Sequence, residues 1–388
     1  MSRSSCGAIG ASTQAFVESS FHSLASAEAA TPAFQRWLLR DAASLEPGRI
    51  LGGLVYGATE GNTVLPAGLA CVPAALLLQQ PLTADVWLAG GPVTAGQTGC
   101  VRWRHDDGHL FGAVDLEEDG SGLEALSRRA YADLFACLAE TGFAHLHRLW
   151  NYLPRINEDG GGLERYRQFN AGRQQAFLDA GQAAFEGSPA ACALGLHRGG
   201  LVLRFLAAKV APQPIENPRQ TPAWRYPADY GPRAPTFSRA AVVRQPDGAK
   251  RLFVSGTASI VGHATVHEGD LHAQLDETLR NLDAVLAEAN RLGGGGFALA
   301  ESDAVVYVRH PADASLLRDR LAAVMGTDSP FLRHAVFLHA DICRRDLLLE
   351  IETHMSVPDR LAVQAASSIE AVGTSGTAPT PPLDEPKR

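Results

Sequence analysis

Two glutamates interrupt an apolar run near the C-terminus, in the stretch HADICRRDLLLEIE (339–352). Their apolar neighbours are typical of a buried strand: Leu347, Leu348, Leu349 and Ile351. An apolar setting raises the pKa of a carboxyl group, so a glutamate placed there can hold a proton near neutral pH and act as a general acid. Alternation along a strand puts Glu350 and Glu352 on the same face. The pattern alone therefore leaves either glutamate as the acid, and either as a solvent-facing residue.

Composition and charge exclude several classes of protein. The chain has 388 residues, a net charge of -8 and 46% hydrophobic residues, and its basic residues form no stripe of the kind that binds nucleic acid. No apolar run approaches the roughly eighteen residues that cross a membrane, and the N-terminus lacks the apolar core of a secretory signal. We therefore expect a cytoplasmic protein with no nucleic-acid or membrane partner. Its six cysteines form no CxxC pair, which is typical of reduced thiols.

Other residue groups that could suggest a metal or a cofactor lack the required context. His263, His267 and His272 lie close together, but no cysteine or carboxylate pair completes a metal-binding set. The run GGGG (293–296) follows a predicted helix instead of preceding one, so it lacks the context of a phosphate-binding loop, and GLVYGATEGN (53–62) lacks the GxGxxG spacing. We expect neither a metal nor a cofactor.

The elements that must position the glutamates form two similar series, separated by a proline-rich connector at 211–238. Apolar residues at helical spacing predict a helix over Leu271–Leu292, and Pro311 is typical of the first position of another. The order of strands and helices predicts two β-β-α-β-α-β-β units, each an α+β sheet with its helices on one face. The predicted elements before the connector lie at 100–116, 123–142, 145–153, 163–181, 192–197 and 201–210, and those after it at 251–259, 271–292, 304–309, 335–342 and 347–352.

These patterns divide the chain into five segments. We expect two folded domains, at 34–210 and 239–356, with the connector contributing to the active site because connectors this long are often functional. The Ser- and Ala-rich segment 1–33 and the polar, Pro-rich segment 366–388 are expected to be disordered.

Several motifs carry a resemblance to known families. The segments SGTASIVG (255–262), HEGDLHAQLDETLRNLDAVL (267–286), VYVR (306–309) and ADICRRDLLLEIE (340–352) resemble the YjgF/RidA family of small trimeric α+β domains. A closer resemblance, to the chorismatase family, rests on RLWNYLPRINE (148–158), ERYRQFNAGR (164–173), ENPRQ (216–220) and YGPR (230–233). Chorismatases remove the enolpyruvyl group of chorismate, giving pyruvate and either a cyclohexadiene diol or a hydroxybenzoate.

The chorismatase resemblance implies roles for particular residues. It selects Glu350 as the catalytic acid, and it assigns substrate binding to Tyr166, Arg173, Gln220 and Arg233. Chorismate carries two carboxylates, which the planar fork of arginine can bind with two hydrogen bonds each. Tyr166 and Arg173 are seven residues apart on a predicted helix and so share a face, although either could instead pack or extend into solvent. Tyr230 and Arg309 are further candidates for the pocket.

The resemblance also bears on the product. The resemblance implies that benzoate-forming members carry Cys and Ala at two pocket positions where diol-forming members carry Ala and Gly, and these positions correspond to Cys343 and Ala258. A bulkier pair leaves less room for an attacking water. We therefore expect a 3-hydroxybenzoate synthase.

Two alternatives stay open. One is a chorismate hydrolase that gives the trans-dihydroxycyclohexadiene carboxylate. The other is a RidA-like imine deaminase or ligand-binding protein, although such deaminases use an arginine on the last strand and LLLEIETH (347–354) contains none. Because two RidA-like units in one chain could imitate part of a trimer, a monomer and a homo-oligomer are both compatible with the sequence.

Overall fold

The computed structural model describes residues 34–57, 65–245 and 248–358. The terminal segments that were expected to be disordered, 1–33 and 366–388, lie outside the described residues. Among the residues described, no helix is both long and apolar enough to cross a lipid bilayer.

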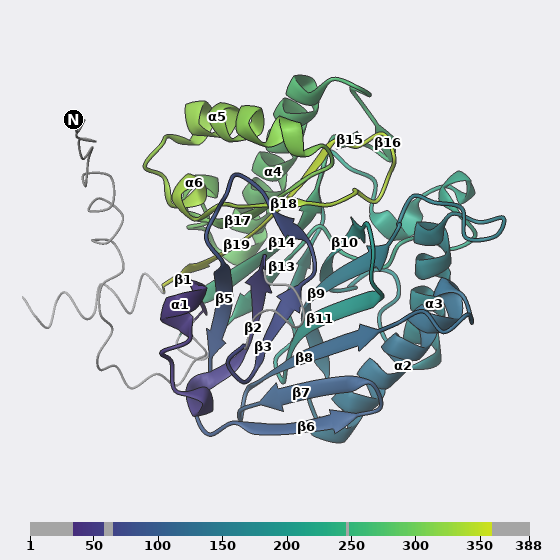
Figure 1. The fold of residues 1–388 in the computed structure, drawn as a ribbon, viewed down its shortest axis with the longest axis vertical. Helices are drawn as coiled ribbons and strands as arrows, with labels where there is room; N and C mark the ends of the chain where they lie inside the picture. Colours follow the sequence, from purple (N-terminus) through teal and green to yellow (C-terminus); the bar gives the residue numbers. More distant parts are fainter. Residues whose placement is uncertain (1–33, 58–64, 246–247, 359–388) are drawn as a thin grey trace, which may run out of the picture.

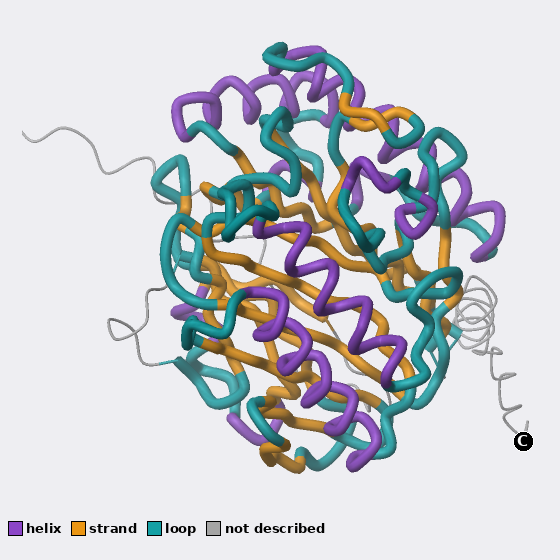
Figure 2. The backbone as a smooth tube through the Cα atoms, turned by 90° about the vertical axis from the view of Figure 1, so that its right-hand side faces the viewer, coloured by secondary structure: helices purple, strands orange, loops and turns teal. Residues whose placement is uncertain are grey.

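The first predicted unit is a six-stranded sheet with two helices on its outer face. Its strands follow the order β10-β9-β11-β8-β7-β6, and α2 and α3 lie side by side across them (Figure 2). Helix α2 ends where Gly142 adopts a left-handed conformation, which glycine tolerates best. The elements are β6 (Thr94–Thr98), β7 (Val101–His105), β8 (His109–Leu116), α2 (Leu123–Thr141), β9 (His145–Pro154), α3 (Arg165–Asp179), β10 (Ala190–Leu196) and β11 (Leu201–Ala208).

The second unit is a seven-stranded sheet in the order β12-β13-β14-β19-β17-β18-β4. Its main elements are β13 (Ala240–Arg244), β14 (Lys250–Thr257), α4 (Leu271–Gly293), β17 (Asp303–Val308), α5 (Ala314–Met325), α6 (Pro330–His334), β18 (Val336–His339) and β19 (Leu349–Val357). Short elements complete it: β4 (Ala75–Leu76), β12 (Gln213–Ile215), β15 (Ile260–Val261), β16 (Ala264–Thr265), η2 (Ala223–Arg225), η3 (Ala228–Tyr230), η4 (Leu299–Glu301) and η5 (Pro311–Asp313).

The two units share one topology. The order β7-β8-β11-β9-β10 in the first corresponds strand for strand to β13-β14-β19-β17-β18 in the second. In each unit the pair formed by the third and fourth strands along the chain is parallel, β9 with β10 and β17 with β18, while the last strand is antiparallel to its neighbours. The prediction of two β-β-α-β-α-β-β units is therefore confirmed.

Residues 34–88 form an additional four-stranded sheet, which the sequence pattern did not distinguish from the rest of the first predicted domain (34–210). Its order is β1-β5-β2-β3, and a buried ion pair joins Arg36 to both carboxylate oxygens of Asp85 at 2.6 and 2.8 Å. Arg36 also donates to two carbonyls of the second unit, at Ala304 and His334. The strand ILGGLVY (50–56) is buried throughout and lacks an alternating pattern, which explains why it was missed. The elements are β1 (Phe34–Leu38), α1 (Leu39–Ala42), η1 (Pro47–Arg49), β2 (Ile50–Tyr56), β3 (Leu69–Val72) and β5 (Thr83–Leu88).

The helix-free faces of the sheets meet in the interior, while the helices lie outside, α4, α5 and α6 on one side and α2 and α3 on another (Figure 1). Strand β19 divides its side chains between these environments. Leu349 and Ile351 pack with the predicted apolar stripe of α4, whereas Glu350 and Glu352 point toward the interior, each only 3% exposed. The expected alternation on this strand is confirmed, and both carboxylates are buried instead of facing solvent.

Candidate active site

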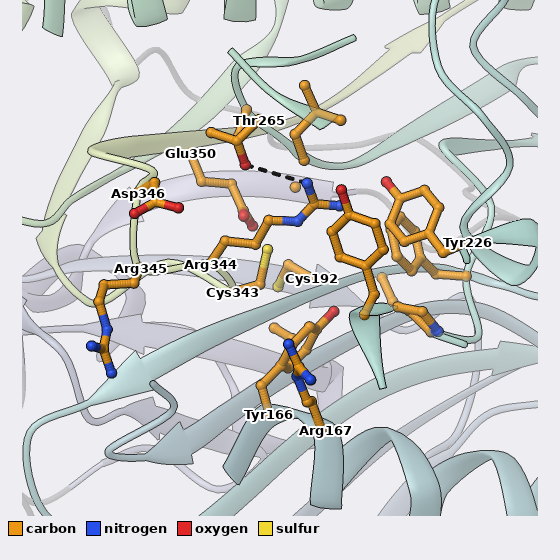
Figure 3. A pocket seen from close by; sticks show the side chains of 18 of the residues that line it. Tyr166, Arg167, Cys192, Tyr226, Thr265, Cys343, Arg344, Arg345, Asp346 and Glu350 are labelled. Atoms are coloured by element: carbon orange, nitrogen blue, oxygen red, sulfur yellow. Dashed lines mark hydrogen bonds between the residues drawn. The ribbon is translucent and has the colours of Figure 1, made fainter. Parts of the chain in front are cut away.

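A cavity of about 410 Å³ lies between the two units (Figure 3). Its walls come from α3 and β10 of the first unit, from β14, β19 and the loop 340–348 of the second, and from the connector. Its charged residues include five arginines, Arg167, Arg173, Arg239, Arg344 and Arg345, and four acidic residues, Glu164, Glu268, Asp346 and Glu350.

Glu350 is the acidic residue whose environment is most unusual. Its side chain reaches the cavity (Figure 3), and within the described part of the chain its carboxyl group has no hydrogen-bond partner. Burial raises the pKa of Glu350 to about 8, with a smaller contribution from the nearby Glu352, while Arg148 and Arg239 oppose the rise. Glu350 therefore holds a proton at neutral pH and can donate it to a molecule bound in the cavity.

Gly256, near the end of β14, makes room for this carboxyl group. A Cβ atom added to Gly256 would lie 2.5 Å from Cδ of Glu350 and closer still to Oε1. These are the nearest atoms, and all of them belong to the Glu350 side chain. A glycine inside a strand often marks such a close approach.

Glu352 has a different environment, although it lies on the same face of β19. Its Oε2 forms an ion pair with Nη2 of Arg148, and its Oε1 accepts a hydrogen bond from Nε1 of Trp150 at 3.1 Å. Glu352 does not line the cavity. The structure thus separates two glutamates that the sequence pattern could not: one is protonated and faces the cavity, and the other is paired behind it.

Three of the lining arginines keep a buried N–H group without a hydrogen-bond partner among the described residues: Nε of Arg173, Nε of Arg239 and Nη2 of Arg344. Their other groups are fixed. Arg173 donates to the Thr236 carbonyl, and Arg239 donates to the carbonyl of Thr221 at 2.9 Å. Free donors on immobilised guanidinium groups can bind an anion at little cost in side-chain entropy.

Arg344 and Arg239 also attach the connector to the cavity. The Arg344 guanidinium lies 4.3 Å from the ring centroid of Tyr230 and 5.2 Å from that of Tyr226, and Arg239 donates to the Tyr226 hydroxyl at 2.8 Å. Arg344 further donates to Oγ1 of Thr265 at 3.2 Å (Figure 3). The connector therefore forms one wall of the cavity, and Tyr230, a sequence candidate, lines it.

Four other sequence candidates also line the cavity: Tyr166, Arg173, Cys343 and Ala258. Tyr166 and Arg173 project from the same face of α3, as their spacing predicts. Burial raises the pKa of the Cys343 thiol to about 12 and also raises that of Tyr166, so both groups are neutral at physiological pH.

The remaining three candidates lie outside the lining of the cavity. Gln220 is buried behind the wall, where its Nε2 donates to the carbonyl of Ile260 at 3.0 Å. Arg233 is exposed, and its Nη2 lies 3.3 Å from Oε1 of Gln175. Arg309 lines a separate pocket of about 230 Å³, where it pairs with Asp341 and donates to the carbonyl of Leu347, so it braces the loop that carries Cys343.

The sequence did not identify Gly256, Arg239, Arg344 or Tyr226 as site residues. Gly256 left a signal, because it is a glycine within a predicted strand. Arg344 follows Cys343 directly, but nothing in its residue type distinguishes it from a surface arginine. Arg239 lies at the end of the connector, and only the folded chain shows that it, and not Arg233, reaches the cavity.

Comparison with known proteins agrees with this geometry. The family model described as "Chorismatase FkbO/Hyg5-like, N-terminal" matches residues 85–207. A chorismatase of Streptomyces rapamycinicus is 41% identical over 278 residues, which are 69% of this chain and 81% of the relative. A 3-hydroxybenzoate synthase of Streptomyces hygroscopicus is 38% identical over 69% of this chain and 80% of the relative. The crystal structure of a chorismatase, 33% identical, superposes with a TM-score of 0.74 and covers 84% of this chain and 98% of that one. The chain therefore belongs to the chorismatase family.

Proposed function

We propose that this protein cleaves chorismate to 3-hydroxybenzoate and pyruvate, with Glu350 as the general acid. Chorismate cleavage is the activity that its family relationship supports, since relatives at about 40% identity are named chorismatase or 3-hydroxybenzoate synthase. The observation that carries the residue assignment is the buried Glu350, which has a pKa of about 8 and faces an arginine-lined cavity.

The chemistry requires an acid of this kind. Proton transfer from Glu350 to the methylene carbon of the enolpyruvyl ether would leave an oxocarbenium ion and a Glu350 carboxylate. A carboxyl group of ordinary pKa would have lost its proton at neutral pH, so a carboxyl group can serve as the acid only if its pKa is raised, as that of Glu350 is.

The arginines fit the charge of the substrate. Chorismate is a dianion, and five arginines line the cavity against three acidic residues other than Glu350. We assign the two carboxylates to the unpartnered donors of Arg173, Arg239 and Arg344. Tyr166 would pack against the ring of the substrate. Gln220 would act indirectly, because it supports the wall at Ile260.

The product depends on whether water reaches the cation. The diol route consumes one water, whereas chorismate equals hydroxybenzoate plus pyruvate with no net water. Cys343 and Ala258 line the cavity. The raised pKa of Cys343 keeps its thiol neutral and a poor nucleophile, and a thiol is only a weak hydrogen-bond partner for water. These properties favour the benzoate route. The imine-deaminase alternative has no support on β19, which carries Glu350 into the cavity and contains no arginine.

The test is to incubate the purified protein with chorismate and to separate the reaction products by chromatography. Pyruvate is measured in the same samples with lactate dehydrogenase. We expect 3-hydroxybenzoate and pyruvate in equal amounts, and strongly reduced amounts of both from Glu350→Gln. A predominance of the diene diol would contradict the benzoate assignment alone. Absence of pyruvate would contradict chorismate cleavage.

A further inference from the structure

The ion pair behind Glu350 has no part in the chemistry described so far. Arg148 on β9 is 2% exposed and extends across the interior to β19 of the other unit, where its Nη2 pairs with Oε2 of Glu352. Its guanidinium also lies over the ring of Trp150 at 5.2 Å, and its Nη1 is buried without a partner among the described residues. Glu352 is fixed from both sides, because its second oxygen accepts from Trp150.

This arrangement places the positively charged guanidinium of Arg148 near the carboxyl group of Glu350, although the two do not form an ion pair. Glu350 and Glu352 are two residues apart on one face of β19, a separation of roughly 7 Å along an extended strand. A buried guanidinium with a free N–H group attracts any carboxylate within reach, and a carboxylate paired with arginine loses its proton readily. In this protein the partner of Arg148 is Glu352, and Glu350 has none in the described chain.

We propose that Glu352 is a positioning residue for the reaction: it holds Arg148 in an ion pair, so that Arg148 does not stabilise the ionised form of Glu350 and the proton stays on the acid. This inference rests on the proposed role of Glu350. It gives the Arg148–Glu352 pair a function beyond packing, because the charge of Glu352 favours the protonated form of Glu350 and the charge of Arg148 favours the ionised form. The directions already found for Glu350 agree, since Glu352 raises its pKa and Arg148 lowers it.

The other titratable groups near Glu350 come from every element packed against it: Tyr166 on α3, Cys192 on β10, Arg239 before β13, Tyr307 on β17, and Cys343 and Arg344 in the loop before β19. Burial raises the pKa of both thiols and both phenols, so these four groups remain neutral. Arg239 and Arg344 are held by the connector tyrosines. Among these surroundings, the Arg148–Glu352 pair therefore places one positive and one negative charge behind Glu350, and the two offset each other.

The test is the pH dependence of kcat/KM in three variants. Glu352→Gln preserves the shape and keeps one acceptor oxygen for Arg148 or Trp150, but it leaves the Arg148 charge uncompensated. At about 7 Å and an effective dielectric constant of about 20, the loss of one charge corresponds to about one to two pH units. Because activity requires protonated Glu350, we expect the alkaline limb to move to lower pH by at least about one unit. Arg148→Met should move it to higher pH, and the double variant Arg148→Met/Glu352→Gln should return it close to the original position.

Opposite shifts in the two single variants are what a merely structural role cannot produce. Removal of one partner of a buried ion pair can prevent folding, so each variant is first checked by circular dichroism and thermal unfolding. A folded variant without measurable turnover is titrated by infrared spectroscopy, using the protonated-carboxyl band that disappears in Glu350→Gln. If a single variant does not fold, the other single variant and the double variant decide.

The inference would be overturned if the alkaline limb of the kcat/KM profile did not shift in the folded single variants, or if it shifted in the same direction in both. It would also be overturned if the alkaline limb of the double variant remained displaced from that of the unaltered protein. Failure of the proposed function is recognised separately. In that case the unaltered protein releases no pyruvate from chorismate, or Glu350→Gln retains turnover, whereas failure of this inference alone leaves the unaltered protein active and Glu350→Gln inactive.

Discussion

Substitution of Gly256 by alanine tests how closely the acid is positioned. The added Cβ would lie 2.5 Å from Cδ of Glu350, whereas non-bonded carbon atoms settle at about 3.5–4.0 Å. The carboxyl group must therefore move by about 1 Å or more. Since the nearest atoms all belong to one side chain, a change of rotamer can relieve the overlap and the fold should survive.

A displacement of this size should reduce turnover more than binding. Misplacement of a catalytic group by about 1 Å can cost up to ~10²-fold in rate, and we expect kcat for chorismate cleavage to fall by about tenfold or more. KM should change little, because the arginines are not displaced. The assay is pyruvate release coupled to lactate dehydrogenase, with thermal unfolding as a check on folding.

Two controls make the result specific. Gly91→Ala adds the same methyl group where no atom beyond the adjacent residues of the chain lies within 4 Å, so its kcat should match that of the unaltered protein. Glu350→Asp shortens the acid by one methylene group, so addition of Gly256→Ala to that variant should cost little further. An unchanged kcat in Gly256→Ala, or equal losses with and without Glu350→Asp, would refute the proposed contact.

Three further outcomes are expected. Arg239→Ala should weaken chorismate binding by roughly 2 kcal/mol, as for loss of a charge-assisted hydrogen bond, while Arg233→Ala should have little effect; equal losses in binding titrations would contradict the cavity assignment. Cys343→Ala combined with Ala258→Gly should raise the ratio of diene diol to 3-hydroxybenzoate in the chromatogram. An unchanged ratio would show that these two residues do not determine the product. Asp85→Asn should lower the free energy of unfolding by about 3–5 kcal/mol in urea titrations, because it leaves a buried guanidinium uncompensated, and a loss below about 1 kcal/mol would show the pair to be dispensable.

Local patterns in the sequence predicted much of the fold. The apolar spacing in 271–292 predicted α4, and the alternation around Glu350 predicted which side chains of β19 share a face, because both depend on the geometry of a single element. The repeated order of elements predicted the shared topology of the two units. The sheet at 34–88 was missed because its buried strand at 50–56 lacks alternation.

The site was only partly predictable, because much of it depends on contacts between distant segments. The motifs of the family indicated Tyr166, Arg173 and Glu350, and the structure places all three at the cavity. The partner of Glu352 lies 204 residues earlier in the chain, and no sequence pattern links the two. For the same reason an exposed arginine such as Arg233 and a buried one such as Arg239 are alike in the sequence.

The account depends most on a protonated Glu350, and the pH dependence of kcat/KM for chorismate tests this directly. A raised pKa of about 8 keeps the acid in its active, protonated form through neutral pH. The account expects a plateau around pH 7 and a one-proton decrease centred near pH 8, with the residual activity of Glu350→Gln lacking that decrease. A rate that falls already between pH 4 and 6, or that continues to rise above pH 8, would contradict a general acid at this position.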